Sequence, residues 1–334
     1  MPPVTAVGSP VGLVLGSHMP PERIVPTARL AEELGFGELW FSEDCFFSGG
    51  IAGVTAALSQ TAHLPVGLGI ASAMTRHPAL HAMEIATMSR LFPGRVWAGV
   101  GLGVPVWLDQ MGLRPSSPLT ALRECVTALR RLLDGDQVTE AGRCFQFDAV
   151  ELTHQPASPV PIYLGVVNEK GLRLSGELAD GTVLSVLAGV AYIAWAREQT
   201  AQGARDGGRD PGEHRLTTYA LYSVDADPVA AREAVREAVA FYLAAMPDND
   251  LSRVYGISDE LGALSSAGGA ELIARELPDS WIDDLAIAGD PEQCAVRLRA
   301  FLEAGSDSVG LWLFPPGQGE AVARLTAREV LPRL

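Results

Sequence analysis

The sequence predicts an α/β fold, a (β/α)8 TIM barrel with insertions, because short apolar runs alternate with amphipathic helical segments along the chain. Eight such runs can be counted over 334 residues, which is the number that the barrel requires. Most of the runs are continuously apolar, as in strands that are buried on both faces. A doubly wound open sheet is the competing architecture, since it uses the same alternation.

The expected strands follow one another at the spacing of strand–helix units. They are residues 11–16, 37–42, 66–71, 95–102, 162–167, 182–187, 216–224 and 308–314. Helical spacing is clearest in residues 21–34, 53–62, 78–91 and 118–133. Gly35 follows the first of these helices, where a glycine commonly ends a helix, and Pro78 opens the third, where its fixed φ is favourable.

Two segments fall outside this repeat, and we expect residues 1–334 to form a single domain that carries both. Polar and apolar residues alternate near residues 137–152, which predicts a hairpin before the fifth strand. Residues 247–280 combine Gly, Ser, Asp and Pro with two short apolar stretches. We expect an excursion there, between the seventh and eighth strands, of the kind that forms lids over active sites.

Charge and composition exclude several classes of function. The formal net charge is −15, from 40 Asp and Glu against 25 Lys and Arg, and Lys170 is the only lysine in the sequence. A negative field of this size disfavours nonspecific binding to nucleic acid or to anionic membranes. No apolar run reaches the roughly 18 residues of a membrane span, and the first residues lack a signal-peptide pattern, so we expect a cytoplasmic protein. The four cysteines are scattered, which predicts neither a metal site nor a disulfide framework.

In a barrel of this kind the active site lies at the C-terminal ends of the strands, which selects a short set of candidates. His18 follows the first strand, and Glu43 and Asp44 follow the second. Adjacent residues on an extended segment point to opposite faces, so we expect at most one of the two carboxylates to face the barrel mouth. Their functional interpretation is a polar contact to a ring ligand or a proton transfer, and their structural interpretation is a helix cap or a surface ion pair.

The third strand leads into a Thr-Arg-His-Pro segment that starts at Thr75. In one interpretation Thr75 or His77 caps the following helix. In the other, Arg76 and His77 form a rim site beside the helix N-terminus, where an anion is favoured. His77 and His81 are four residues apart, but no third ligand follows on that face, so we expect no metal site.

The glycines at positions 99, 101 and 103 do not form a dinucleotide fingerprint, because the third comes too early and Val104-Pro105-Val106 follows. We expect them to leave room for a planar ligand over the barrel mouth. In the fifth strand, Gly165 permits a close approach of a ligand to the backbone, and the helix that begins near Asn168 offers free amides that can cradle a phosphate. Lys170 lies at that helix start, although an accidental surface lysine is an equally good interpretation.

A combination of motifs connects the chain with one family. The motifs are Leu34-Gly35-Phe36-Gly37-Glu38-Leu39-Trp40-Phe41-Ser42-Glu43-Asp44, Gly69-Ile70, Thr75-Arg76-His77-Pro78, Pro161-Ile162-Tyr163-Leu164-Gly165 and Gly176-Glu177-Leu178-Ala179-Asp180-Gly181. Over roughly residues 10–315 the chain resembles the luciferase-like (β/α)8 oxidoreductases. Within them it is most similar to the deazaflavin-dependent branch that includes methylenetetrahydromethanopterin reductase.

The resemblance implies an enzyme, in the first instance a reductase, that transfers a hydride between coenzyme F420 and a small organic substrate. The ring would lie in the barrel mouth and the phosphate tail would run toward the fifth strand. Glu43 would contact the deazaflavin head, and Gly69 and Ile70 would form a non-proline cis peptide behind the ring. The other implied cofactor residues are Ala71, Ser72, Arg76, Gly101, Gly103, Gly165, Val166, Val167 and Lys170.

The resemblance also implies roles in proton transfer and substrate binding. Asp44, His18 or His77 would supply or remove the proton that accompanies the hydride, with Glu43 as a further catalytic candidate. The substrate pocket would be shaped by Met74, Trp107 and Trp312.

Two positions depart from the pattern of the family. Asp44 stands where some deazaflavin enzymes carry a catalytic histidine, and Val104 stands where the sugar-phosphate dehydrogenases of the branch place a glutamate. These departures disfavour the oxidation of a sugar phosphate. Two alternatives stay open, an FMN-dependent monooxygenase of the same fold and a non-catalytic flavin-binding relative. Members of the family often pair, so we expect a homodimer with no nucleic-acid or membrane partner.

Overall fold

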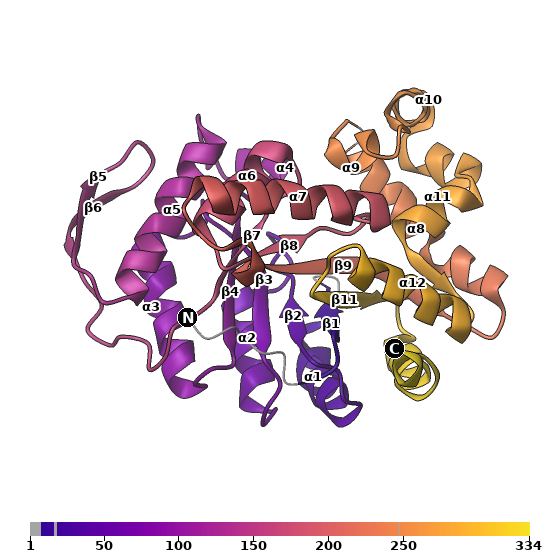
Figure 1. The fold of residues 1–334 in the computed structure, drawn as a ribbon, viewed down its shortest axis with the longest axis horizontal. Helices are drawn as coiled ribbons and strands as arrows, with labels where there is room; N and C mark the ends of the chain where they lie inside the picture. The colour runs from indigo at the N-terminus through magenta and orange to yellow at the C-terminus, as the bar shows by residue number, and fades with distance from the viewer. Residues whose placement is uncertain (1–7, 17–18, 247) are drawn as a thin grey trace.

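The computed structural model describes residues 8–16, 19–246 and 248–334. Eight parallel strands close into a barrel in the order β1-β2-β3-β4-β7-β8-β9-β11, because β9 pairs with both β8 and β11, and β11 pairs with β1. Helices surround the strands in Figure 1, so the predicted (β/α)8 barrel is confirmed and the open sheet is excluded. The strand bounds are Val11–Leu15 (β1), Leu39–Phe41 (β2), Val66–Ser72 (β3), Val96–Gly101 (β4), Ile162–Gly165 (β7), Gly181–Leu184 (β8), Arg215–Val224 (β9) and Ser308–Leu313 (β11).

The barrel interior is filled by aromatic rings that pack against glycines of neighbouring strands. The centroid of the Trp40 ring lies 5.2 Å from that of Tyr163 and 6.1 Å from that of Tyr219, and all three side chains are buried. A Cβ at Gly67 would lie 2.2 Å from Trp40, so this ring fits only because β3 has a glycine there. Trp40 therefore points into the barrel, and its neighbours Leu39 and Phe41 pack outward against the helices.

The outer layer covers the strands with one main helix for each of them (Figure 1). The main helices are Ile24–Glu33 (α1), Gly50–Ser59 (α2), Pro78–Leu91 (α3), Pro118–Leu133 (α5), Glu169–Leu178 (α6), Val190–Asp206 (α7), Pro228–Ala245 (α8) and Pro291–Glu303 (α12). The helices predicted at 78–91 and 118–133 have the predicted bounds. The helix predicted at 53–62 begins earlier, at Gly50, and the one predicted at 21–34 begins with a 3₁₀ turn, Pro21–Arg23. Gly35 follows α1 with a φ of +78°, a conformation that favours glycine.

Several short elements and strand ends differ from the prediction. Two short elements, α4 (Pro105–Gln110) and β10 (Ile287–Gly289), were not predicted from the sequence. The strand β10 is too short to show periodicity and pairs with the end of β9. The fifth and sixth strands end before residues 167 and 187, because residues 166–168 turn into α6 and Leu187 adopts a φ of +71°. The chain closes with α13 (Gly319–Leu325), a π-helical turn (Thr326–Val330) and a 3₁₀ turn (Leu331–Arg333), and a further 3₁₀ turn is Pro211–Glu213.

Two units lie outside the strand–helix repeat, on opposite sides of the barrel in Figure 1. One is the antiparallel pair β5 (Val138–Ala141) and β6 (Gln146–Val150). The other consists of α9 (Asp250–Arg253), α10 (Ser258–Glu276) and α11 (Asp279–Leu285), which follow α8 in the chain. Both α10 and α11 pack against α8, so this second unit stands beside the C-terminal half of the barrel.

The described cysteines and helices bear on two further properties. All four cysteines are free, and burial raises the pKa of the Cys125 and Cys294 thiols to about 12. Within the described residues, no helix combines the length and the apolar character that a membrane span needs.

Candidate functional site

The two adjacent carboxylates after β2 lie on opposite sides of the chain. Glu43 packs toward the outer layer, because a Cβ at Gly50 of α2 would meet its side chain and that of Leu68. Asp44 instead lies near Tyr242, on the side of the barrel mouth. Burial and, after it, the nearby carboxylate of Asp44 raise the pKa of Tyr242 on α8. The Tyr242 ring in turn lies 6.2 Å from the ring of Trp312 at the end of β11. Asp44, Tyr242 and Trp312 therefore line one side of the mouth.

Glu43 is held in an ion pair behind the mouth. Its Oε1 lies 2.7 Å from Arg76 Nη2, and Arg76 Nε lies 3.4 Å from Glu84 on α3. A Cβ at Gly50, the first residue of α2, would lie 2.5 Å from Glu43 Oε2. Burial opposes the charge of Arg76, but Glu43 and Glu84 outweigh it and raise the pKa of the guanidinium. Two of the predicted cofactor residues, Glu43 and Arg76, are thus brought together.

Glu43, Arg76 and the nearby His81 have buried polar atoms that form no hydrogen bond within the described chain. These atoms are Glu43 Oε2, Arg76 Nη1 and both ring nitrogens of His81. Burial, and after it the positive charge of Arg76, lower the pKa of His81 to about 4, so this imidazole is neutral near pH 7. From the sequence, His81 was a candidate only for metal binding, because a helical position alone does not reveal that its ring is buried beside Arg76.

His77 faces away from the barrel mouth. Its Nδ1 accepts a hydrogen bond from the backbone N–H of Ala79, 3.2 Å away, which caps α3. Its Nε2 lies 3.2 Å from the carbonyl oxygen of Gln146, and its ring lies 4.8 Å from that of Phe147. Both ring nitrogens are therefore engaged in structural contacts with α3 and the hairpin. This geometry does not fit the expected role of His77 in proton transfer.

The end of β3 is irregular at the predicted position. The Gly69–Ile70 peptide bond is cis, and the register with β4 shifts between Leu68 and Ala71. Tyr219 donates a hydrogen bond from its hydroxyl to the Gly69 carbonyl oxygen, 3.3 Å away, from inside the barrel. Ala71 is fully buried among the outer helices rather than exposed at the mouth.

The glycines near the mouth make room for protein side chains. A Cβ at Gly101 would lie 1.8 Å from Ile70 Cδ1, and one at Gly165 would lie 2.8 Å from Ile70 Cγ2. Gly103, with a φ of +94°, lies against the side chain of Ser72, whose hydroxyl donates to the Leu102 carbonyl oxygen at 2.6 Å. The expectation that Gly101 leaves space for a planar ligand is therefore wrong, because the Ile70 side chain already fills that space.

The turn from β7 into α6 carries the predicted phosphate site. Asn168 caps α6 by accepting from the Gly171 N–H at 2.8 Å, and Val167 accepts from the Tyr192 hydroxyl at 2.5 Å. Val166 packs against Gly171, where a Cβ would lie 2.9 Å from the valine side chain. The N–H of Glu169 donates to Asp250 of α9 at 3.0 Å. The amides of this helix start are therefore less free than the sequence predicts, because the excursion supplies a carboxylate that no local pattern reveals.

Lys170 lies on the outer side of α6. Its side chain is exposed and forms no ion pair with the described residues. It lines a cavity of about 310 Å³ between α5 and α6, together with Leu119, Thr120, Arg123, Arg173, Leu174 and Glu177. The lysine is adjacent to the phosphate site along the chain but points away from the mouth.

The predicted substrate residues are only partly brought together. Trp107 on α4 contacts Phe47 from the loop after β2, with ring centroids 6.1 Å apart, and Trp312 lies across the mouth beside Tyr242. Met74 instead packs against the outer core. Phe46, which no sequence pattern singled out, is 66% exposed and has a φ of +74°. His18 lies outside the described residues.

A second cavity lies apart from most of the candidate residues. It has a volume of about 630 Å³, lies between α1 and α13 and reaches the mouth at Gly16 and Trp312. It lies apart from Glu43, Arg76 and the start of α6, so it is not the site that these residues form. In the same described ranges, no group of three His, Cys, Asp or Glu side chains is arranged to hold a metal ion.

Comparison with known proteins gives consistent similarities. The family model described as luciferase-like monooxygenase matches residues 4–308. The 5,10-methylenetetrahydromethanopterin reductase of Methanolobus tindarius is 32% identical over 288 residues, which cover 85% of this chain and 87% of that protein. The corresponding reductase of Archaeoglobus fulgidus is 29% identical over 315 residues, which cover 92% of this chain and 94% of that protein.

The structural comparison agrees with these sequence similarities. The structure of the coenzyme F420-dependent tetrahydromethanopterin reductase from Methanopyrus kandleri superimposes with a TM-score of 0.80 and 25% identity. The superposition covers 97% of this chain and 99% of that one. The similarity thus extends over the barrel and over the segments inserted in it.

Proposed function

The chain belongs to the luciferase-like monooxygenase family, and from this premise we propose that it is an oxidoreductase that transfers a hydride between coenzyme F420 and a small organic substrate. The observation that carries the proposal is the similarity, over most of both chains, to reductases of one kind, one of which is described as F420-dependent. When bound, the deazaflavin supplies the carbon that donates or accepts the hydride. The protein supplies binding, orientation and the control of one proton.

Glu43, just behind the mouth, has an acceptor that suits the head of such a ring. Glu43 Oε2 is a buried acceptor without a partner in the described residues, and Arg76 fixes the other oxygen of the same carboxylate. A buried acceptor of this kind loses free energy unless a donor reaches it, so a ligand N–H or O–H at this position is favoured. We assign Glu43 to the cofactor head, with Ile70 and Ser72 behind the ring.

Asp44 is the residue that we assign to proton transfer. It faces the mouth beside Tyr242 and Trp312, whereas both ring nitrogens of His77 are engaged elsewhere. A carboxylate that reaches the reacting atoms can hold or release the proton that accompanies the hydride. Trp107 and Trp312, on opposite sides of the mouth, would position the substrate by contact with its apolar surface.

The phosphate end of the cofactor is proposed to lie at the turn between β7 and α6. Gly165 keeps the backbone close to the mouth, and the start of α6 favours an anion because its amides and dipole are positive there. Val166 and Val167 line this turn, and Lys170 adds a nearby cation on a protein of net charge −15. The tail would leave the mouth along this edge.

An FMN-dependent monooxygenase is the second candidate, and the description of the family model favours it. The two candidates differ in the ring atom at position 5, which is carbon in the deazaflavin and nitrogen in FMN. We favour F420 because the similar reductases, one of which is described as F420-dependent, match most of this chain. The substrate is proposed to be reduced rather than oxidised, and Val104 at the mouth disfavours a sugar phosphate.

The test is a fluorescence titration of the purified protein with oxidised F420 and, separately, with FMN. We expect saturable binding of F420 at micromolar or lower concentration and weaker binding of FMN. Tight binding of FMN without binding of F420 would replace the first candidate by the second. Binding of F420 without turnover of any tested electron acceptor or donor would support the non-catalytic alternative.

We further propose a single-domain, cytoplasmic homodimer. Four free cysteines are typical of a reducing compartment. Leu80, Met83 and Leu91 form an exposed apolar stripe on α3, with exposed fractions of 55%, 50% and 63%, which a second copy would cover. Met83→Asp should convert the dimer into a monomer in sedimentation, and an unchanged sedimentation coefficient would exclude this face.

A further inference from the structure

An acidic side chain of the excursion occupies the start of α6. The Oδ2 atom of Asp250 accepts a hydrogen bond from the backbone N–H of Glu169, 3.0 Å away, although the two residues are 81 positions apart. The side chain of Asp250 is only 18% exposed and also lies 3.2 Å from Arg253. Figure 1 shows α9 close to the ends of α6 and α7. The contact is thus specific and partly shielded from water.

The first-turn amides of α6 can be accounted for one by one. Glu169 donates to Asp250, Gly171 donates to the Asn168 side chain, and Leu172 donates to the Asn168 carbonyl oxygen. For the N–H of Lys170, the described residues contain no acceptor. A helix start stabilises one negative charge well, because its amides and dipole act together there. In this structure that charge is the carboxylate of Asp250.

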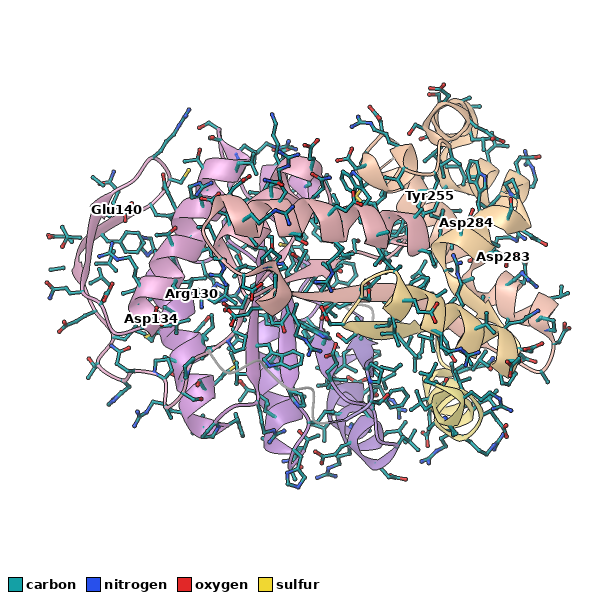
Figure 2. All side chains as sticks on the ribbon, in the orientation of Figure 1. Arg130, Asp134, Glu140, Tyr255, Asp283 and Asp284 are labelled. Carbon is teal, nitrogen blue, oxygen red and sulfur yellow. The ribbon has the colours of Figure 1, made fainter. Side chains whose placement is uncertain are left out.

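The segment that carries Asp250 is joined to the same edge of the barrel by a second contact. The Tyr255 hydroxyl accepts a hydrogen bond from the N–H of Tyr192, at the start of α7, and Figure 2 shows Tyr255 beside that helix. The Tyr192 hydroxyl donates to Val167, in the turn before α6. Asp250 and Tyr255 therefore place α9 over the turn that we assign to the cofactor phosphate.

We propose that Asp250 competes with the cofactor phosphate for the α6 helix start and so determines the selectivity of the protein for the phosphate-bearing cofactor. This inference rests on the proposed function, since it takes the phosphate to bind at the turn between β7 and α6. Two anions cannot share the Glu169 N–H without repulsion, so the phosphate binds only when the carboxylate leaves. The affinity for F420 is lowered by the free energy of that displacement, and the affinity for a ligand without phosphate is not.

The test compares two ligands that share the deazaflavin ring. One is F420, and the other is its riboside, which lacks the phosphate and everything beyond it. The quantity measured is the selectivity ratio, Kd of the riboside divided by Kd of F420, from fluorescence titrations. In Asp250→Asn, which keeps the shape but removes the charge, we expect this ratio to rise roughly three- to tenfold.

Asp248→Asn is the matched control. Asp248 lies two residues before Asp250, pairs with the same Arg253 at 2.8 Å and is 73% exposed. Removing its charge changes the local field by the same formal unit without freeing the amide of Glu169, so the ratio should stay within about twofold of wild type. Asp250→Ala, which also removes the acceptor, should raise the ratio at least as much as Asp250→Asn.

The outcomes separate the inference from the proposed function. A ratio that is unchanged or lower in both Asp250 variants overturns the inference, as does an equal rise in Asp248→Asn. Damage to the fold lowers the affinity for both ligands and cancels in the ratio, so it cannot imitate the expected result. If wild-type protein binds neither ligand, the proposed function fails, and the inference fails with it.

Discussion

Arg76 joins Glu43, at the end of β2, to Glu84, on α3. The guanidinium lies 2.7 Å from Glu43 Oε1 and 3.4 Å from Glu84 Oε2, and no more than about a third of any of the three side chains is exposed. The bridge fixes one oxygen of Glu43 and leaves Oε2 without a partner in the described chain. The orientation of the proposed cofactor contact is therefore set by an arginine that follows a different strand.

Glu43→Gln should weaken the binding of F420 about tenfold, because a hydrogen bond to a charged group contributes roughly 1.5–3 kcal/mol. Fluorescence titration measures the change in Kd. Glu84→Gln is the control, because it also takes one carboxylate from Arg76 but lies on α3, and its Kd should stay within about twofold of wild type. Equal losses in both variants would mean that Glu43 acts only through Arg76.

Acid should destabilise the protein through two buried histidines. Burial is the first cause that lowers the pKa of His81 and of His214 to about 4. In the unfolded chain each titrates near 6.5, so between pH 6.5 and pH 4 the unfolded state binds more protons than the folded state. The free energy of unfolding therefore falls as the pH is lowered through this window, by up to about 3 kcal/mol for each histidine. Urea denaturation at pH 7 and pH 5 measures the difference.

At pH 7, replacement of each of the two histidines should change the free energy of unfolding by a different amount. His214 is hydrogen-bonded on both sides, to the Thr182 hydroxyl at 2.8 Å and to the Ala179 carbonyl oxygen at 3.2 Å, whereas the ring nitrogens of His81 have no partner among the described residues. His214→Leu leaves the buried Ala179 carbonyl oxygen without its donor and the Thr182 hydroxyl with Ser175 alone, and it should cost about 2 kcal/mol. His81→Leu should stay within about 1 kcal/mol of wild type, and a cost as large as that of His214→Leu would reveal hidden partners of His81.

The sequence predicted the barrel because its strands are buried on both faces, and strands of this kind are continuously apolar in sequence. The bounds of α3 and α5 were predictable as well, since a proline opens each helix and the apolar spacing continues to its end. The sequence also predicted that at most one of Glu43 and Asp44 faces the mouth. Which one does so depends on tertiary contacts, those of Glu43 with Arg76 and of Asp44 with Tyr242, which no local pattern reveals.

Other features depend on contacts that no local pattern contains. A glycine in a strand indicates free space, but the sequence does not say whether a ligand or the Ile70 side chain fills the space beside Gly101. The contact between Asp250 and Glu169 joins an insertion to a helix start far away in the chain, so neither segment signals it. His77 was given two interpretations because its position suits a cap and a rim site equally, and the hairpin contact distinguishes them.

Gly101→Ala should destabilise the protein by about 2 kcal/mol or more, because its Cβ would lie 1.8 Å from Ile70 Cδ1. Ile70→Val removes Cδ1, so the double variant should recover a large part of the loss even though Ile70→Val alone costs about 1 kcal/mol. Thermal unfolding of the wild type, the two single variants and the double variant gives the coupling free energy between the two substitutions. If the two costs simply add, Ile70 is not what requires glycine at this position.

Lys170→Ala tests whether the only lysine of the sequence contributes to the cofactor site. Its side chain is exposed beside the 310 Å³ cavity between α5 and α6 and forms no ion pair with the described residues, so its charge is available to an anionic tail. We expect the Kd for F420 to rise about threefold at low salt, since exposed charge pairs contribute roughly 0.2–1 kcal/mol, and the Kd for the phosphate-free riboside to stay unchanged. The difference should shrink as added salt screens the charge. Arg205→Ala, at an exposed cation in the last turn of α7, is the matched control for net charge. If F420 binds Lys170→Ala and Arg205→Ala equally well at low salt, Lys170 is an ordinary surface residue.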